Sequence, residues 1–260
     1  MIHPEQAAQI LNHTIIAERY FFPQPAKVID PVRIPIDCGE LHCWRSAAPS
    51  NKPVLLHFHG NGELIQHWIP GFAPLLQTFG FEVFLAEYRG YGSSSGQPQL
   101  LSLLHDVPNI VKAVGVHPEK LVVFGRSVGS IFAIEAAHQF PNIAGLVLES
   151  GIANVYQRLR LRMLPEELNC NEEQFQQAVK LHFDHHHKLQ QYTKPLLLLH
   201  AVHDQLVTIA HAEHNLASAS SVQKKLIRFP QGNHNSIMSA NQGTYFHHLH
   251  RFLQTLPLNP

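Results

Sequence analysis

Short apolar runs alternate with longer amphipathic stretches along most of the chain. The apolar runs are rich in Val, Leu, Ile and Phe, which is typical of strands buried on both faces, and the stretches between them repeat apolar residues at helical spacing. The pattern predicts strands at residues 32–36, 41–47, 53–57, 81–86, 120–124, 145–148, 196–200 and 225–229. It predicts helices at residues 67–79, 100–114, 128–140, 209–219 and 244–256.

This alternation predicts an α/β fold with a mostly parallel central sheet that is covered by helices on both faces. The first two strands are joined by a short turn around Asp37 and Gly39, so we expect them to form an antiparallel edge. A polar stretch at residues 152–192 interrupts the alternation. We expect it to form a helical cap or lid inside one domain that spans residues 1–260.

Composition narrows the possible classes of protein. Of the 260 residues 45% are hydrophobic, enough for one large core, and 19 basic residues balance 19 acidic ones, which argues against a nucleic-acid binder. The three cysteines, Cys38, Cys43 and Cys170, indicate free thiols in a reducing compartment. No signal peptide and no apolar run of about 18–20 residues is visible, so the sequence predicts a cytoplasmic protein without a transmembrane segment.

The sharpest chemical signal is the G-x-S-x-G pattern of residues 125–129, which follows a predicted strand and precedes a predicted helix. In that context the glycines leave room for a tight turn that exposes the serine hydroxyl above the sheet. The pattern therefore predicts Ser127 as a nucleophile.

A nucleophilic serine needs a base and an acid that orients the base, and on a sheet of this kind the acid precedes the base along the chain. Asp204 follows the strand predicted at 196–200, and His234 follows the last strand, so we expect these two residues to be the acid and the base. Glu149, at the end of the strand predicted at 145–148, is the competing acid. Among the 21 histidines, His203 precedes the last strand, and the three on the last helix are interpreted as surface residues.

The Gly-rich stretch after the third strand, His-Gly-Asn-Gly at 59–62, is the candidate oxyanion loop. We expect the backbone N–H groups of Asn61 and Val128 to bind the oxyanion, with Gly60 and Gly62 allowing the loop to turn inward. The alternative is a Gly-rich turn that only closes the loop. A second Gly/Ser-rich stretch, residues 87–96, lacks the Lys-Ser/Thr ending of a phosphate-binding loop and is interpreted as a structural loop held by Arg89.

Histidines at 182 and 185–187 raise the possibility of a metal site. Adjacent histidines diverge on a helix, and no H-E-x-x-H motif occurs, so we expect no functional metal and no cofactor.

The stretches HGNG, EYRGYGSSSG, GRSVG, the acid loop and GNHN occur in the order found in the α/β-hydrolase superfamily. The chain, from about Val32 to its end, most resembles the small α/β-hydrolase-domain branch that includes protein depalmitoylases. The resemblance implies triad roles for Ser127, Asp204 and His234. Ala201 and Asn233 differ from the residues frequent in relatives, which bears on loop geometry and removes no catalytic group.

Together these features predict a serine hydrolase that cleaves a carboxylic ester or thioester of a small-molecule or acylated substrate through an acyl-enzyme on Ser127. Amide hydrolysis is the less expected activity. Two alternatives stay open at this point: a hydrolase scaffold that has lost its activity and acts as a binding protein, and a His-rich protein that responds to metal or pH. The oligomeric state is left open by the sequence.

Overall fold

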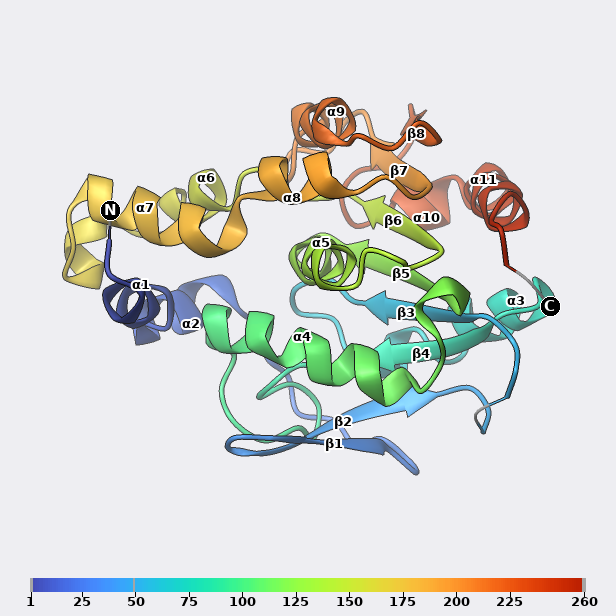
Figure 1. The fold of residues 1–260 in the computed structure, drawn as a ribbon, viewed down its shortest axis with the longest axis horizontal. Helices are drawn as coiled ribbons and strands as arrows, with labels where there is room; N and C mark the ends of the chain where they lie inside the picture. The colour runs from blue at the N-terminus through green and yellow to red at the C-terminus, as the bar shows by residue number, and fades with distance from the viewer. Residues whose placement is uncertain (1, 49, 259–260) are drawn as a thin grey trace.

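The computed structural model describes residues 2–48 and 50–258, and its centre is a sheet of eight strands (Figure 1). The strands are β1 (Val32–Ile36), β2 (Gly39–Arg45), β3 (Val54–Phe58), β4 (Glu82–Ala86), β5 (Leu121–Arg126), β6 (Gly145–Glu149), β7 (Leu196–Ala201) and β8 (Lys224–Phe229). They lie in the order β1-β2-β4-β3-β5-β6-β7-β8. β1 and β2 pair antiparallel at one edge, and the strands from β3 to β8 run parallel, as the sequence predicts.

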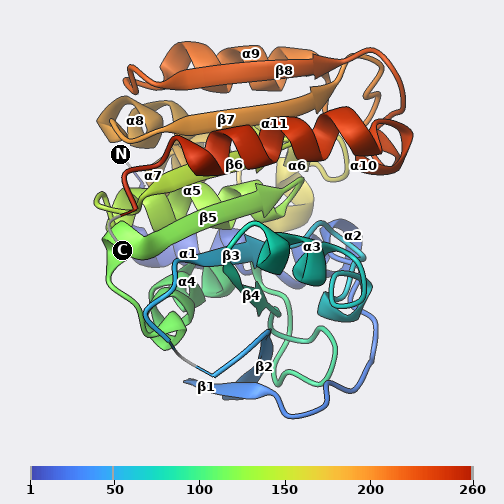
Figure 2. The same ribbon diagram turned by 90° about the vertical axis from the view of Figure 1, so that its right-hand side faces the viewer.

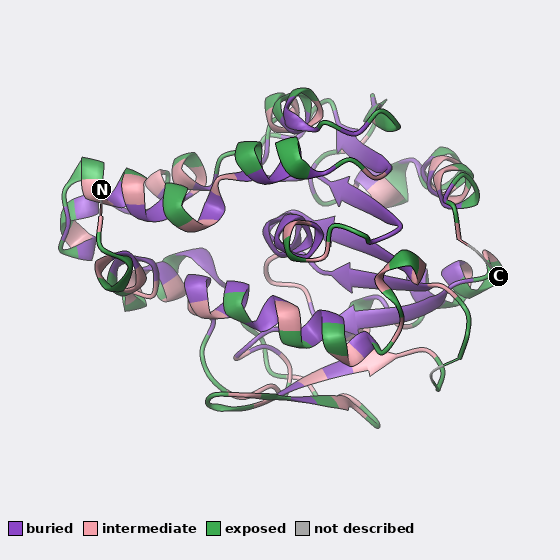
Figure 3. Cartoon of the chain, in the orientation of Figure 1, coloured by how far each residue is buried: buried purple, intermediate pink, exposed green. Residues whose placement is uncertain are grey.

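Helices cover both faces of this sheet, which confirms the predicted fold class (Figure 2). One face carries α4 (Leu100–Val114), α5 (Gly129–Gln139), α8 (His185–Gln191) and α9 (Ile209–Ser218). The other carries α3 (Phe72–Thr78), α10 (Ile237–Ala240) and α11 (Gln242–Gln254). The central strands are buried along their whole length because both of their faces meet helices (Figure 3).

A separate group of helices lies beyond the carboxyl ends of the parallel strands (Figure 1). It consists of α1 (Pro4–Leu11), α2 (Thr14–Tyr20), α6 (Val155–Arg160) and α7 (Glu172–Phe183), and α1 packs against α7. The N-terminal segment, for which the sequence pattern predicted no element, thus joins the 152–192 insertion above the sheet. None of the helices in the described part of the chain combines the length and apolarity needed to cross a membrane.

The helix predicted at residues 67–79 is wrong in its first half. A short 3-10 turn spans Ile65–His67, and α3 begins only at Phe72. Pro70 and Gly71 separate the two, since proline lacks the amide that a helix interior needs and glycine disfavours helical backbone. α4 tolerates an internal proline, Pro108, and begins and ends where the apolar spacing predicts.

Candidate active site

Ser127 lies in a sharp turn between β5 and α5, with a left-handed φ of 53° that is rare for a residue with a side chain. The flanking glycines are required by space. A Cβ on Gly125 would lie 2.5 Å from the Cβ of Ala133, and one on Gly129 would lie 2.2 Å from the carbonyl oxygen of Phe58. The close approach of the turn to β3 therefore excludes any side chain at position 129, and Ser127 lies at the carboxyl edge of the sheet.

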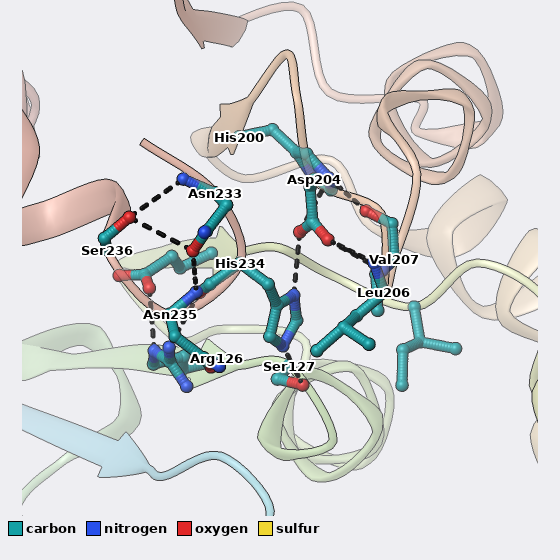
Figure 4. Close-up of polar contacts among 12 residues, drawn as sticks. Arg126, Ser127, His200, Asp204, Leu206, Val207, Asn233, His234, Asn235 and Ser236 are labelled. Atoms are coloured by element: carbon teal, nitrogen blue, oxygen red, sulfur yellow. Dashed lines mark hydrogen bonds and ion pairs between the residues drawn. The ribbon is translucent and has the colours of Figure 1, made fainter. Parts of the chain in front are cut away.

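Ser127, His234 and Asp204 form a continuous hydrogen-bonded series (Figure 4). Nε2 of His234 lies 2.8 Å from Oγ of Ser127, and Nδ1 of His234 lies 2.7 Å from Oδ2 of Asp204. A carboxylate can only accept, so Nδ1 carries the hydrogen and Nε2 presents the lone pair that accepts the serine hydroxyl. The three predicted residues thus come together from three strand ends; their catalytic role stays a prediction.

Asp204 is fixed from its other oxygen by the backbone of its own loop. Oδ1 accepts hydrogen bonds from the amides of Leu206 at 2.9 Å and Val207 at 2.8 Å. Burial acts to raise the pKa of the Asp204 carboxyl, but the hydrogen bonds from His234 and from the Val207 amide oppose it, so the pKa lies below its ordinary value. Asp204 is therefore held as a carboxylate.

His200, at the end of β7, is a neighbour of this series that the sequence analysis missed. Its Nε2 donates to the carbonyl oxygen of Val207 at 2.7 Å and lies 3.5 Å from Oδ2 of Asp204. Burial lowers the pKa of the ring, so the neutral form is favoured. The signal that could have found it is a polar residue at the end of a run of four leucines.

Asn61 and Val128 face the same cavity as Ser127. Within the described ranges neither backbone N–H has a hydrogen-bond acceptor in the protein, as a group that binds an oxyanion requires. Two hydrogen bonds fix the Asn61 side chain: its Oδ1 accepts from the amide of Phe22 at 3.0 Å and from the hydroxyl of Tyr91 at 2.8 Å. Gly62 has a φ of 73°, which explains the second glycine of the motif. The oxyanion assignment stays a prediction.

Arg126, next to the nucleophile, links three loops of the site. Its Nε donates to Glu149 at 2.8 Å, its Nη2 donates to the carbonyl oxygen of His234 at 2.9 Å, and its Nη1 donates to Glu63. Glu63 in turn accepts from the amide of Gly60 at 2.7 Å. The serine turn, the histidine loop and the Gly-rich loop are therefore held by one guanidinium group.

Glu149, the competing acid, makes no hydrogen bond to His234 among the described contacts. It accepts from Arg126 and from the hydroxyl of Tyr245 instead. Burial raises the pKa of its carboxyl, against the opposing effects of the Arg126 charge and the Tyr245 hydrogen bond. Among the described contacts Glu149 therefore anchors Arg126 and does not orient His234.

The Gly/Ser-rich stretch at 87–96 contacts the Gly-rich loop at 59–62 through a buried pair of side chains. His59 is fully buried, with Nε2 at 2.7 Å from Oε1 of Glu87 and Nδ1 at 2.8 Å from the carbonyl oxygen of Gly60. Burial acts to lower the pKa of His59, but the charge and hydrogen bond of Glu87 raise it above its ordinary value. Arg89 holds the stretch to the rest of the protein through Asp106, whose Oδ1 accepts from Nη2 at 2.7 Å.

The histidines at 182–187 lie apart from Ser127. In residues 2–48 and 50–258, no three His, Cys, Asp or Glu side chains are grouped to hold a metal ion. His185 donates to the carbonyl oxygen of Ile152 at 2.8 Å, and burial lowers its pKa to about 3. It lines, with His186 and His214, a surface hollow of about 630 Å³ that includes neither Ser127 nor His234. The three cysteines are free thiols.

A cavity of about 180 Å³ opens above Ser127, smaller than the roughly 300–1,000 Å³ of pockets that enclose drug-sized ligands. Four residues that the sequence does not point to also line the cavity. They come from the N-terminal segment, from α6 and from the turn after α6: Tyr20, Phe22, Arg158 and Arg162. The chain carries no periodic signal for these positions, because long-range packing alone brings the two segments over the sheet.

Comparison with known proteins agrees with this architecture. YfhR of Escherichia coli O157:H7, described as uncharacterized, is 29% identical over 213 residues, which cover 77% of this chain and 70% of YfhR. Alpha/beta hydrolase domain-containing protein 17B of Xenopus laevis is 25% identical over 183 residues, or 68% of this chain and 57% of that protein. The structure of the Pyrococcus furiosus esterase Pf2001 superposes with a TM-score of 0.73 at 18% identity, covering 92% of this chain and 99% of the esterase.

The family described as serine aminopeptidase S33 matches residues 49–180, half of the chain, including the Gly-rich loop and the serine turn. The chain therefore belongs to the serine aminopeptidase S33 family of α/β hydrolases.

Proposed function

We propose that this protein is a serine hydrolase that cleaves a carboxylic ester or thioester through an acyl-enzyme on Ser127. The observation that carries the proposal is the series from Oγ of Ser127 through the His234 ring to Asp204, with separations of 2.8 and 2.7 Å. A neutral imidazole with its lone pair toward the hydroxyl is the arrangement that general-base activation of serine requires.

In the acylation half-reaction, Nε2 of His234 takes the hydroxyl proton while Oγ of Ser127 bonds to the substrate carbonyl carbon. The carbonyl oxygen becomes an oxyanion, which the N–H groups of Val128 and Asn61 bind. The tetrahedral intermediate then expels the leaving alcohol or thiol, which receives the proton from His234. Asp204 stabilises the imidazolium while it exists, and its carboxylate state, favoured by the Val207 amide, suits that role.

In the deacylation half-reaction, a water molecule gives a proton to His234 and attacks the acyl carbonyl. The second oxyanion collapses, the bond to Oγ breaks, and Ser127 takes the proton back from His234. The carboxylic acid leaves, and the free enzyme is restored without a cofactor.

The composition of the pocket favours esters over the peptides that the family name suggests. An aminopeptidase must bind the α-ammonium group of its substrate, and a carboxylate is the partner that compensates such a charge. Among the described residues that line the cavity there is no Asp or Glu, whereas Arg158 and Arg162 are present without a carboxylate partner in that part of the chain. A positive wall repels an ammonium group, so we do not assign aminopeptidase activity.

The size of the cavity favours a short acyl chain. We propose that residues 152–192, with the N-terminal helices, act as the cap that limits it, because α6 supplies part of its wall. A long acyl chain would not fit inside the cavity of about 180 Å³, so it would have to extend out into solvent or displace this cap. Activity on a series of acyl esters and thioesters, from acetyl to palmitoyl, should therefore peak at the short members.

Labelling with a fluorophosphonate probe tests the nucleophile directly. The wild-type protein should be labelled covalently, and Ser127→Ala should not be, because the probe bonds to the activated hydroxyl. Ser239→Ala, which removes an exposed serine of α10, is the matched control and should label like the wild type. Persistent labelling of Ser127→Ala would overturn the assignment.

A further inference from the structure

Two arginines reach the cavity from the cap. Arg158 lies on α6, and Arg162 lies four residues later in a turn that continues the helix, where its amide donates to the carbonyl oxygen of Leu159 at 2.9 Å. Residues four apart on a helical turn share one side, and both arginines line the cavity that contains Ser127 and His234.

In the part of the chain that the structure describes, no carboxylate neutralises either of these two charges. Arg160, between them, pairs with Glu172 at 3.3 Å, and Arg126 pairs with Glu149 and Glu63. Among the described residues, Arg158 and Arg162 have no carboxylate partner, and none lines the cavity. Two like charges at this spacing repel each other, so the arrangement lowers stability unless an anion joins them.

Arg158 also carries an unused hydrogen-bond donor. Its Nε is buried and has no acceptor in the described protein, which is unfavourable for a guanidinium nitrogen shielded from water. Tyr20 and both arginines line the same cavity. Burial raises the pKa of the Tyr20 hydroxyl to about 12, and the charges of Arg158 and Arg162 oppose this rise.

Arg162 is held at the rim by contacts that leave its charge uncompensated. Its Nη1 donates to the carbonyl oxygen of Arg19 at 3.2 Å, and its guanidinium carbon lies 5.3 Å from the centre of the Phe22 ring. Stacking on an aromatic ring orients a guanidinium group and leaves donors available for an anion.

We propose that Arg158 and Arg162 bind an anionic group of the substrate, a carboxylate or a phosphate that lies within a few bonds of the scissile carbonyl. The inference rests on the proposed function, since Ser127 is taken as the nucleophile at that carbonyl. The anionic group must lie close to the scissile carbonyl because Ser127 and both arginines line one cavity of only about 180 Å³. The enzyme thus selects a charged ester or thioester over a neutral one of the same shape.

Isosteric substrate pairs test this selection. 4-Acetoxybenzoate and 4-acetoxybenzamide differ by a carboxylate on the leaving group, and monoethyl glutarate and ethyl 4-carbamoylbutanoate differ by a carboxylate on the acyl side. 4-Acetoxyphenyl phosphate is the phosphate arm. We expect kcat/KM of the wild-type enzyme to be roughly ten- to a hundredfold higher for the anion of at least one pair, the range expected for a hydrogen bond to a charged group.

Variants of the three arginines of this segment assign the selection to residues. Arg158→Gln should lower the ratio of anionic to neutral kcat/KM by roughly tenfold or more, and Arg162→Gln, whose side chain is exposed, by a smaller factor. Arg158→Lys should restore part of the ratio, since it keeps the charge and loses the fork of donors. Arg160→Gln is the matched control: it removes an equal charge from the same helix, outside the cavity, and should leave the ratio unchanged.

A wild-type ratio near one for every pair, or equal falls in the Arg158→Gln and Arg160→Gln variants, would overturn the inference. Calorimetric titration of Ser127→Ala with 4-acetoxybenzoate separates this failure from failure of the proposed function. If the wild-type enzyme hydrolyses no ester, the proposed function is refuted. If Ser127→Ala nevertheless binds 4-acetoxybenzoate and Ser127→Ala/Arg158→Gln does not, the anion site is still supported. Ser127-dependent hydrolysis of neutral and anionic esters at equal rates does the reverse.

Discussion

Replacing Arg126 with Met should destabilise the protein strongly, because Arg126 is the ion-pair partner of a buried carboxylate. The Arg126 side chain is 7% exposed, and that of its partner Glu149 is 1% exposed. Arg126→Met keeps most of the apolar stem and removes the charge, so Glu149 is left as a buried carboxylate with Tyr245 as its remaining donor. Glu63, at the more open side of the network, is 21% exposed and can turn to solvent.

The expected loss is about 3–5 kcal/mol in the free energy of unfolding, the range for breaking a buried ion pair by removing one partner. That is a large fraction of the roughly 5–15 kcal/mol by which folded domains are stable. Arg126→Met/Glu149→Gln should recover most of the loss, because glutamine carries no charge and still accepts from Tyr245. Catalysis should fall as well, since the carbonyl of His234 and the Gly60 loop lose their shared support.

Urea unfolding followed by tryptophan fluorescence and circular dichroism measures both variants. Arg228→Met is the control: its pair with Glu213 is half exposed on both sides, at 50% and 51%, so its loss should stay within about 1 kcal/mol. A loss below about 1 kcal/mol for Arg126→Met, or no recovery in the double variant, would refute the reasoning.

Three further predictions concern the acid, a buried histidine and the serine turn. Asp204→Asn should lower kcat by roughly 10⁴-fold with unfolding midpoint preserved, since the amide favours the wrong tautomer of His234; a loss under about tenfold would contradict this. Burial lowers the pKa of His57 well below its ordinary value, so below about pH 6.5 the unfolded chain binds a proton on His57 and the folded protein does not. The free energy of unfolding should therefore fall by up to about 1.4 kcal/mol for each unit by which the pH drops below that value. His57→Leu should flatten that slope in urea titrations between about pH 6 and 5, and equal slopes would argue against it. Gly129→Ala should lower the free energy of unfolding by at least about 1–3 kcal/mol, because its Cβ would overlap a backbone oxygen. Gly243→Ala, with open space around it, should leave stability unchanged or raise it. Similar shifts of the melting temperature in both variants would count against the argument.

Much of the fold could be predicted because its elements have local signatures. Strands buried on both faces read as apolar runs, and β1 and α4 begin and end where the pattern places them. Where the signature was mixed the prediction failed: the apolar residues from His67 onward suggested one helix, and Pro70 with Gly71 divided it. The N-terminal helices α1 and α2 span only 8 and 7 residues, too short for their apolar spacing to distinguish a helix from a loop.

The sequence by itself determined which serine stands in a strand–turn–helix, and which acid and histidine follow later strand ends. Those features are local, and the order of strand ends along the chain fixes which of them can meet at one edge of a parallel sheet. Only the tertiary structure decided that Glu149 pairs with Arg126 and that His200 lies beside Asp204. It alone also brought Arg158 and Arg162 over Ser127. These contacts join segments far apart in the chain, and they depend on packing and on the pairing of buried charges, which no local period of the sequence encodes.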